Sequence, residues 1–396
     1  MDFEGIFFNT SDYELTSQNL GEGALGTLFI VEKIKDKSKY AAKIINSQKV
    51  FTGDDQMRLM RQSAILQKLN HPAITKFYGI NFHSFNDQTL LQPTILTEFL
   101  PQGSIQQIFY KLRQNQAINE WNGTKKMICL LGISSAMKCL HQKSIFNHFL
   151  KPNNVLIDEK FYPRISDFYY PHIFSKNQKV EEFFYMAPEK LEGKDIFGPG
   201  TDVYSFAILA YEIITGKVPY VIENDSTTVS EFIEKVKSGD RPILDDSISE
   251  SMKDLLLKCW CQKADERPSF DDIFEKLSTD FSILNEEVDK EEIEKYLKCL
   301  ENSSINESPK DDKNDAESVK ELKKIIASHK RINEYYMEMF SVLTESDDNL
   351  QNVYIKSFGG NILFPACRSG NLKLVKFFMS FDKINITEKN VFFNFS

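Results

Sequence analysis

The stretch from His141 to Tyr169 constrains this chain more than any other part of the sequence. It reads HQKSIFNHFLKPNNVLIDEKFYPRISDFY, in which Lys-Pro-x-Asn precedes an Asp that follows a short apolar segment. This frame is typical of a phosphoryl-transfer loop, where an Asn and an Asp hold metal ions and a carboxylate accepts the proton of the attacking hydroxyl. Where such a loop has that carboxylate, this chain has Phe149. The frame therefore predicts a phosphoryl-transfer fold with incomplete catalytic chemistry.

A second feature is the G-x-G-x-x-G spacing of Gly21, Gly23 and Gly26. Alone this pattern is weak, because glycines mark many tight turns. A dinucleotide site needs a helix to begin at the third glycine, whereas β-prone residues 27–31 follow here, then a turn and a return strand that carries Lys43. We expect a hairpin whose glycine tip covers phosphates, because no Cβ keeps the backbone N–H groups away. A plain hairpin turn is the alternative.

The hydrophobic pattern divides the chain into a strand-rich part and a helix-rich part. From Tyr13 to about Tyr110 it predicts short strands separated by turns, with one helix among them. From Trp121 onward it predicts helices. The expected strands are 28–31, 40–45, 74–80 and 94–99, and the expected helices are 56–69, 121–142, 203–215, 231–237, 249–260 and 270–284.

From about Tyr13 to Leu284 the chain resembles a protein kinase domain, and the run from Asp202 to Tyr220 is closest to the tyrosine-kinase-like Ser/Thr branch. Several motifs occur in the order that the family has them. They are Tyr40-Ala41-Ala42-Lys43, Asn70-His71-Pro72, Thr97-Glu98-Phe99-Leu100, Ala187-Pro188-Glu189, Asp202-Val203-Tyr204-Ser205-Phe206 and Glu266-Arg267-Pro268. The resemblance implies an α+β, bilobal protein kinase fold with a small β-rich N-lobe and a helical C-lobe. Its cofactors would be ATP and Mg²⁺.

The resemblance also assigns roles to particular positions. Lys43 would hold the α- and β-phosphates, and Lys151 is the loop lysine of Ser/Thr-type kinases. Glu189 should pair with Arg267, and Asp202 should hold the backbone of the catalytic loop. The metal would be held by Asn154 and Asp167, and the nucleotide by Leu20, Gly21, Gly23, Gly26, Leu28, Ala41, Lys43, Thr97, Glu98, Leu100 and Leu156.

The same positions show where the chain departs from the family. Phe149 has no lone pair to accept a proton, and the interval from His141 to Asn154 contains no Asp or Glu. Gln62 stands where the family has the glutamate that pairs with the phosphate-binding lysine. Other losses touch activation: Tyr169 replaces a glycine, Glu182 a threonine and His148 an arginine. We interpret the chain as a pseudokinase that still binds Mg-ATP and acts as a signalling scaffold. The alternatives are a slow Ser/Thr kinase and a nonenzymatic protein that works through its C-terminal end.

Composition changes after Leu284. Residues 285–358 are expected to form a helical linker, with a charged amphipathic helix at 285–301 and a polar stretch at 302–316 whose composition is that of disorder. Residues 359–396 resemble an ankyrin repeat. Because ankyrin units normally need neighbours for stability, this segment either caps the preceding helices or begins a longer array. A helix-turn-helix packed on the preceding helix is the other interpretation.

Bulk composition narrows the partners. The chain has 396 residues and a net charge of −9, which does not favour nucleic acid or an anionic membrane. No apolar run approaches the roughly 20 residues that span a bilayer, and the N-terminus lacks the pattern of a signal peptide. We therefore expect a cytoplasmic protein without a membrane span. Its partners would be ATP and proteins that contact the kinase-like surface or the ankyrin-like segment.

Overall fold

The structure is a computed structural model that describes residues 6–23, 26–45, 53–85, 91–143, 145–147, 150–167, 180–192, 198–221 and 228–304. The chain divides into two compact units, Met1–Ser308 and Pro309–Ser396. All described residues belong to the first unit. The polar stretch beyond Ser304, the rest of the expected linker to residue 358 and the ankyrin-like segment at 359–396 lie outside the described residues.

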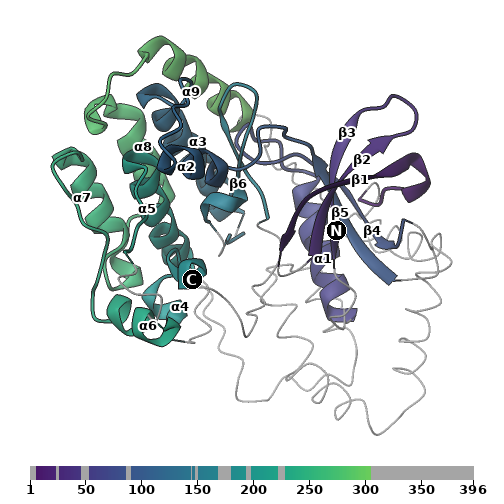
Figure 1. The fold of residues 1–396 in the computed structure, drawn as a ribbon, viewed down its shortest axis with the longest axis horizontal. Coiled ribbons are helices and arrows are strands. Elements are labelled where there is room, and N and C mark those ends of the chain that lie inside the picture. The colour runs from purple at the N-terminus through teal and green to yellow at the C-terminus, as the bar shows by residue number, and fades with distance from the viewer. Residues whose placement is uncertain are drawn as a thin grey trace, which may run out of the picture. The chain divides into compact units, whose positions relative to one another are not determined.

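The N-terminal part is a five-stranded antiparallel sheet with one helix. Its strands are β1 (Tyr13–Gly23), β2 (Gly26–Lys33), β3 (Lys39–Ile45), β4 (Phe77–His83) and β5 (Leu91–Glu98), in the order β1-β2-β3-β5-β4. Helix α1 (Gly53–Leu66) packs beside β4 (Figure 1). The glycine-rich hairpin and its return strand are confirmed as β1, β2 and β3.

A short segment before β1 extends this sheet at its other edge. Phe7 forms a parallel bridge with Ile80, the Phe8 amide donates to the Ile80 carbonyl, and the Ile80 amide donates to Ile6. Gly79 makes this close approach possible, because a Cβ there would lie 2.9 Å from the Ile6 carbonyl oxygen. The N-terminal segment therefore covers the exposed edge of β4, which would otherwise be open to pairing with another chain.

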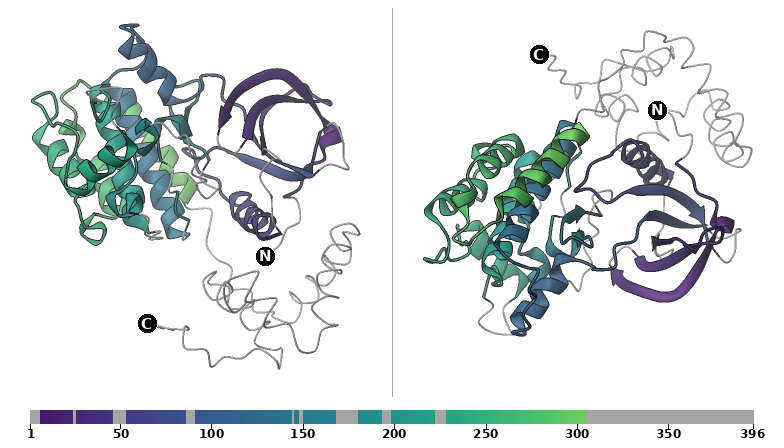
Figure 2. Two further views of the ribbon diagram at one scale, coloured as in Figure 1. Left: turned by 60° about the horizontal axis from the view of Figure 1, so that its bottom comes forward. Right: turned by 90° about the horizontal axis from the view of Figure 1, so that it is seen from above.

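The C-terminal part is helical and is built around α3 and α5. Its helices are α2 (Ile105–Arg113), α3 (Gly123–Gln142), α4 (Pro188–Leu191), α5 (Pro199–Thr215), α6 (Val229–Lys237), α7 (Glu250–Cys259), α8 (Phe270–Thr279) and α9 (Lys290–Ser304), with a small hairpin of β6 (Val155–Ile157) and β7 (Pro163–Ile165). Residues 201–214 of α5 are buried without interruption, as the apolar run at 203–215 predicted. Figure 2 shows α9 beside α3 and the sheet with α1 on the other side of the domain.

Local sequence explains where several helices begin and end. Thr228 and Glu231 form a capping box at the start of α6, which satisfies backbone amides that have no helical partner. Ser269 and Asp272 do the same for α8. Helix α5 ends at Gly216, which has a φ of 67° that glycine adopts readily.

Three sequence predictions were wrong in detail. A strand was expected from residue 74, but β4 begins at Phe77, because residues 73–75 bond to Ile165 of β7 instead. Helix 270–284 ends at Thr279, since Asp280 leaves the helical conformation and a 3-10 turn, Phe281–Ile283, follows. Helix α2 occupies residues 105–113, where the strand-rich part was expected to continue to about Tyr110.

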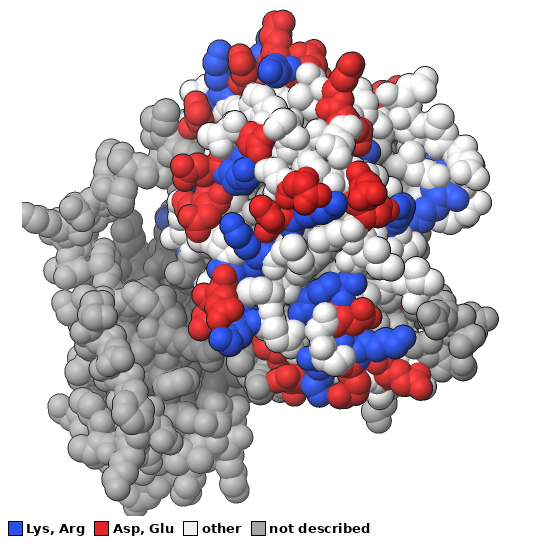
Figure 3. All heavy atoms as spheres, turned by 90° about the vertical axis from the view of Figure 1, so that its left-hand side faces the viewer, with Lys and Arg blue, Asp and Glu red and all other residues white. Residues whose placement is uncertain are grey.

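Two further observations concern the surface. On the face drawn in Figure 3, where the helical part faces the viewer, basic and acidic side chains are interspersed instead of separated by sign. Within the part of the chain that the structure describes, no helix is both long enough and apolar enough to cross a membrane.

Candidate functional site

The predicted glycine hairpin has different reasons for its glycines. Gly26 begins β2, and a Cβ there would lie 2.0 Å from the carbonyl oxygen of Ile44 on the neighbouring strand. Close packing against β3 therefore explains the glycine at position 26. This agrees with the alternative of a plain hairpin turn. Gly21 differs, because no atom of the described residues lies within 4 Å of the place where its Cβ would be. Its amide donates to the Asn19 side chain at 2.7 Å. Its open surroundings leave room for a ligand to approach the backbone.

Lys43 lies in the middle of the sheet and pairs with the metal-site aspartate. Strand β3 is flanked by β2 and β5, which place Leu28 and Ile95 opposite Lys43. The Lys43 ammonium lies 2.8 Å from Oδ1 of Asp167, and its side chain is 19% exposed. Gln62, on α1, is half-buried, and no hydrogen bond joins these two described side chains. The neutral amide at position 62 leaves Asp167 as the carboxylate that neutralises Lys43.

The β6–β7 hairpin brings together the two residues predicted to bind metal. Its register pairs Val155 with Ile165, so Asn154 and Asp167 flank the same end of the hairpin. The Ser166 amide and hydroxyl both donate to the Asn154 carbonyl, at 2.8 and 3.2 Å. Asp167 has a φ of 58°, a left-handed conformation that is uncommon outside glycine and often found at functional sites.

These two side chains supply the kind of atoms that Mg²⁺ prefers, namely carboxylate and amide oxygens. Asp167 is one-third exposed, while Asn154 is buried. Lys43 adds a cation at the same place, which suits phosphate oxygens. The residues present thus fit a magnesium–phosphate group, and the structure brings Lys43 and Asp167 into direct contact.

The segment 97–100, which the resemblance assigns to the nucleotide, consists of the end of β5 and the two residues after it. Thr97 is buried and pairs with Ala41 across β3 and β5. The carbonyl oxygen of Leu100 accepts from Gly103, whereas its amide donates to no acceptor among the described residues. Leu156 forms a bridge with Ser104 and so lies next to this segment. A backbone donor at Leu100 is what recognition of adenine by the main chain requires.

Glu98, the remaining residue of that segment, has structural partners. Its carboxylate accepts from the Lys76 amide at 2.8 Å and lies 3.9 Å from Arg164 of β7. Leu20 on β1 is partly exposed.

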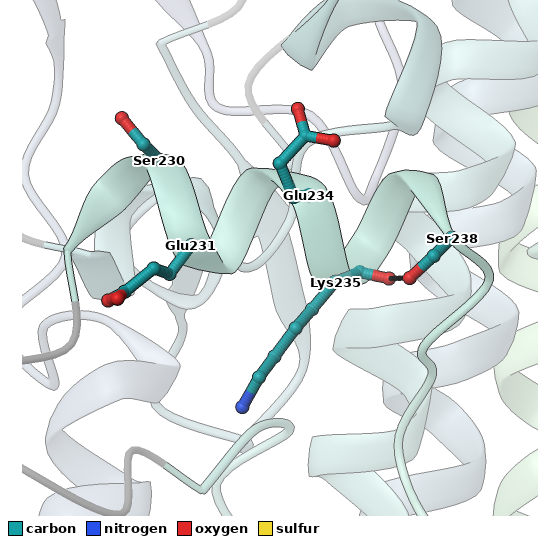
Figure 4. A pocket seen from close by; sticks show the side chains of 5 residues that line it. All are labelled: Ser230, Glu231, Glu234, Lys235 and Ser238. Atoms are coloured by element: carbon teal, nitrogen blue, oxygen red, sulfur yellow. Dashed lines mark hydrogen bonds between the residues drawn. The ribbon is translucent and has the colours of Figure 1, made fainter.

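A surface depression seen in Figure 4 lies elsewhere, on α6, and is lined by Ser230, Glu231, Glu234, Lys235 and Ser238, none of which belongs to the predicted site.

Asp202 binds the backbone of the loop before β6, as predicted. Asp202 is fully buried, and its Oδ2 accepts from the Asn147 amide at 2.8 Å and lies 2.9 Å from Nε2 of His141. Lys151 is half-buried and precedes the 3-10 turn Pro152–Asn154. His148 and Phe149 lie outside the described residues. The described ends of the loop are thus held firmly on both sides of the position where the family has its base.

A buried polar cluster around Glu212 of α5 was not foreseen from the sequence. The Tyr185 hydroxyl and the Arg113 guanidinium both bond to the carboxylate of Glu212 on α5. Burial raises the pKa of Tyr185 well above its usual value, and burial also raises the pKa of Glu212. These contacts make Tyr185 a structural residue.

The predicted pair of Glu189 and Arg267 is confirmed. Arg267 is fully buried, and two of its nitrogens donate to the two carboxylate oxygens of Glu189 at 2.7 and 2.9 Å. It also donates to the carbonyl oxygens of Gly200 and Cys261. The bidentate pair links α4 to the segment before α8.

Comparison with known proteins agrees with this geometry. The profile of the protein kinase domain matches residues 14–278. A probable serine/threonine-protein kinase of Dictyostelium discoideum is 33% identical over 273 residues, which are 65% of this chain and 15% of that protein. A serine/threonine-protein kinase of Arabidopsis thaliana is 29% identical over 243 residues, covering 60% of this chain and 40% of its own length. An Arabidopsis thaliana protein kinase and PP2C-like domain-containing protein is 28% identical over 287 residues, 63% of this chain and 41% of that protein. The match thus spans less than half the length of each of these relatives.

Proposed function

Since the chain belongs to the protein kinase domain family, we propose that it binds ATP with Mg²⁺ and transfers the γ-phosphate very slowly or not at all. The observation that carries this proposal is the contact between Lys43 and Asp167 in a chain that has Phe149 at the position of the base. The groups that hold a nucleotide are retained, and the group that takes the proton is absent.

Each retained residue has a distinct part in nucleotide binding. The Lys43 ammonium is the cation for the phosphate oxygens, and the oxygens of Asn154 and Asp167 would hold Mg²⁺. When bound, the metal supplies neutralisation of phosphate charge. The Leu100 amide offers a donor to the base, and Thr97 closes the buried side of that segment. Together they support binding without any need for a proton acceptor.

The size of the expected catalytic loss can be bounded. A general base contributes about 10²- to 10⁴-fold to the rate of a typical enzyme, and active kinases turn over at about 1–100 s⁻¹. Loss of the base alone therefore predicts turnover of about 10⁻⁴ to 1 s⁻¹. The absence of a carboxylate at Gln62 lowers it further, because among the described residues Lys43 pairs with the metal-site aspartate.

Nucleotide binding is tested by the thermal unfolding of the full chain with and without Mg-ATP. We expect the wild type to be stabilised, because a ligand that binds only the folded state raises its unfolding temperature. Lys43→Ala should lose this stabilisation while its unfolding without nucleotide stays close to that of the wild type. Equal stabilisation of both proteins, or of neither, would refute the nucleotide site.

A slow Ser/Thr kinase is the second candidate, favoured by the serine/threonine kinases among the relatives. Positioning and electrostatics supply much of the rate in enzymes, so transfer can survive without a base. Radiolabel transfer to a generic protein substrate separates the candidates, with Asp167→Ala as the blank. Transfer above that blank, raised by about 10²-fold or more in Phe149→Asp, would establish slow catalysis limited by the missing carboxylate.

A scaffold role through protein partners is part of the same proposal, and the ankyrin-like segment at 359–396 is the part of the sequence that best suits it. Deletion of residues after 304 should then remove partners that the full chain captures, while Mg-ATP still stabilises the shortened protein. Capture of the same partners by both proteins would assign binding to the kinase domain instead.

A further inference from the structure

Helix α9 lies beyond residue 278, where the family match ends, and yet it is part of the folded domain. Its side chains Ile293, Tyr296 and Leu300 recur at helical spacing and are all buried. The helix packs along α3, as Figures 1 and 2 show. The described residues 279–304 therefore complete the helical part and do not begin a free linker.

The packing of α9 reaches the hairpin that carries the metal-site residues. At Gly132, in the middle of α3, a Cβ would lie 2.4 Å from the Tyr296 hydroxyl and 2.5 Å from Cγ of Pro163. A glycine inside a helix costs about 0.5–1 kcal/mol relative to alanine, so its presence here has a structural reason. It allows α9 and the first residue of β7 to meet against α3.

Polar contacts also hold Tyr162, next to β7, between α9 and α3. Tyr162, directly before β7, donates from its hydroxyl to Oε1 of Glu292 on α9 at 3.0 Å. Glu292 also forms an ion pair with Lys125 of α3, whose ammonium lies 4.8 Å from the centre of the Tyr162 ring. The rings of Tyr162 and Tyr296 are 4.7 Å apart. Tyr162 is thus held by α9 on one side and α3 on the other.

The β6–β7 hairpin connects Tyr162 to the candidate site. Asp158 and Tyr162 close its turn, with the Asp158 amide donating to the Tyr162 carbonyl at 3.0 Å. Three cross-strand residue pairs separate this turn from the open end of the hairpin. There the Ser166 amide donates to the carbonyl of Asn154. A two-stranded hairpin is marginally stable by itself. Its geometry therefore depends on the surfaces that hold it.

We propose that α9 is a positioning element of the candidate site. Through Glu292 and Tyr296 it holds the turn of the β6–β7 hairpin, and the hairpin transmits this restraint to Asn154 and Asp167. These α9 residues act through the hairpin and do not touch the nucleotide. The expected effect on nucleotide affinity rests on the proposed function, and the effect on the hairpin does not. Because coupling between two sites is reciprocal, a ligand that orders Asp167 must also strengthen the docking of α9.

Hydrogen exchange of the full chain without nucleotide tests the restraint. Glu292→Ala removes the contacts to Tyr162 and Lys125, and Glu291→Ala is its matched control, since both residues lie in the first turn of α9 and Glu291 pairs only at the surface with Lys295. We expect peptides covering 153–167 to exchange about tenfold faster in Glu292→Ala, the effect of losing a hydrogen bond to a charged group. Exchange in α7 and in the control should match the wild type.

Unchanged exchange at 153–167 in Glu292→Ala would overturn the inference. If that variant fails to fold, Tyr162→Phe removes only the hydroxyl of the same bond and takes its place with the same expected result. Faster exchange throughout the domain, α7 included, would also count against it, because general destabilisation is not positioning.

A second measurement adds Mg-ATP. In the wild type we expect slower exchange over residues 290–304 at saturation, and in Glu292→Ala a severalfold weaker affinity than in Glu291→Ala. Binding without protection of α9, and with equal affinities in both variants, would refute the coupling. Failure of the wild type to bind Mg-ATP would refute the proposed function alone, and the exchange comparison without nucleotide would still decide whether α9 positions the hairpin.

Discussion

At the level of single residues, Lys43 and Asp167 neutralise each other across 2.8 Å. A bound phosphate–metal group would interact with the same two side chains. The ligand and the ion pair therefore involve the same two charges. The two can coexist, because an ammonium can face phosphate oxygens while a neighbouring carboxylate faces a cation. The contact holds both side chains at one place, which lowers the cost of ordering them when a ligand binds.

Gln62 is the residue that decides this arrangement, and restoring a carboxylate there tests it. In Gln62→Glu the new side chain should attract the Lys43 ammonium and leave Asp167 more available to a metal. We expect the gain in ATP affinity on adding Mg²⁺ to rise by about threefold to fivefold, since a partly exposed ion pair contributes up to about 1 kcal/mol. Paired titrations with and without Mg²⁺ measure it. An unchanged ratio would show that Lys43 does not compete for Asp167.

His71 links the two parts of the domain and should make stability depend on pH. Its Nδ1 accepts from the Ala73 amide, and its Nε2 lies 3.1 Å from the Ser135 hydroxyl on α3. Burial, followed by the charge of Arg164, lowers the pKa of His71 from 6.5 to about 4. The folded protein therefore favours the neutral ring, whereas the unfolded chain binds a proton near pH 6.5.

Stability from His71 is complete above pH 6.5 and is lost as the pH falls toward 4, because only the unfolded state gains a proton in that window. Between pH 7 and 5 we expect a loss of about 2 kcal/mol in the free energy of unfolding from this residue. Urea unfolding of His71→Asn should show a pH dependence smaller by that amount. The exposed His83, changed to Asn, is the control and should keep the full dependence. Equal slopes in wild type and His71→Asn would contradict the assignment.

At the level of elements, the pair of Arg267 and Glu189 joins α4 to the segment before α8. Breaking a buried ion pair from one side typically costs about 3–5 kcal/mol, because the remaining charge is left without its partner. Arg267→Ala should therefore lower the stability of the domain strongly and can be followed by urea unfolding. Lys263→Ala, which breaks an exposed pair with Glu266, is the matched control and should leave the transition where it is. Similar transitions for both variants would show that the pair at α4 is not structural.

The β6–β7 hairpin and the β1–β2 hairpin bring the site residues together in different ways. The first places Asn154 and Asp167 by its register, with bonds from Ser166 to the Asn154 carbonyl. The second runs along the same sheet as Lys43, with Leu28 opposite it in β2. The glycine pattern predicted the β1–β2 hairpin, whereas the strands β6 and β7 were not expected from the sequence.

At the level of the whole molecule, hydrophobic periodicity predicted the strand-rich and helix-rich parts, and the resemblance to the protein kinase family implied the bilobal architecture. The contacts that depend on distant partners did not. Nothing local to Tyr185 indicates that Glu212 would bury its hydroxyl, and nothing in Ile6–Phe8 indicates that Gly79 would leave room for it. The Lys43–Asp167 pair was also missed, because the sequence shows no Glu at Gln62 but does not show which carboxylate Lys43 contacts.

The boundary of the domain was another matter of long-range packing. Sequence composition changes after Leu284, which led us to expect a linker from residue 285, while α9 packs on α3 through three buried side chains and belongs to the unit that ends at Ser308. The amphipathic pattern at 285–301 indicated a helix, but only the fold shows the surface that receives it. Cytoplasmic location, protein partners and the ankyrin-like segment stay predictions.

The central claim is that this kinase domain binds nucleotide without efficient transfer, and calorimetric titration of the full chain with Mg-ATP, paired with phosphotransfer on the same sample, tests it most directly. We predict saturable binding by the wild type, none by Lys43→Ala, and turnover no higher than about 1 s⁻¹. No heat of binding in the wild type, or turnover in the range of active kinases despite Phe149, would contradict the account.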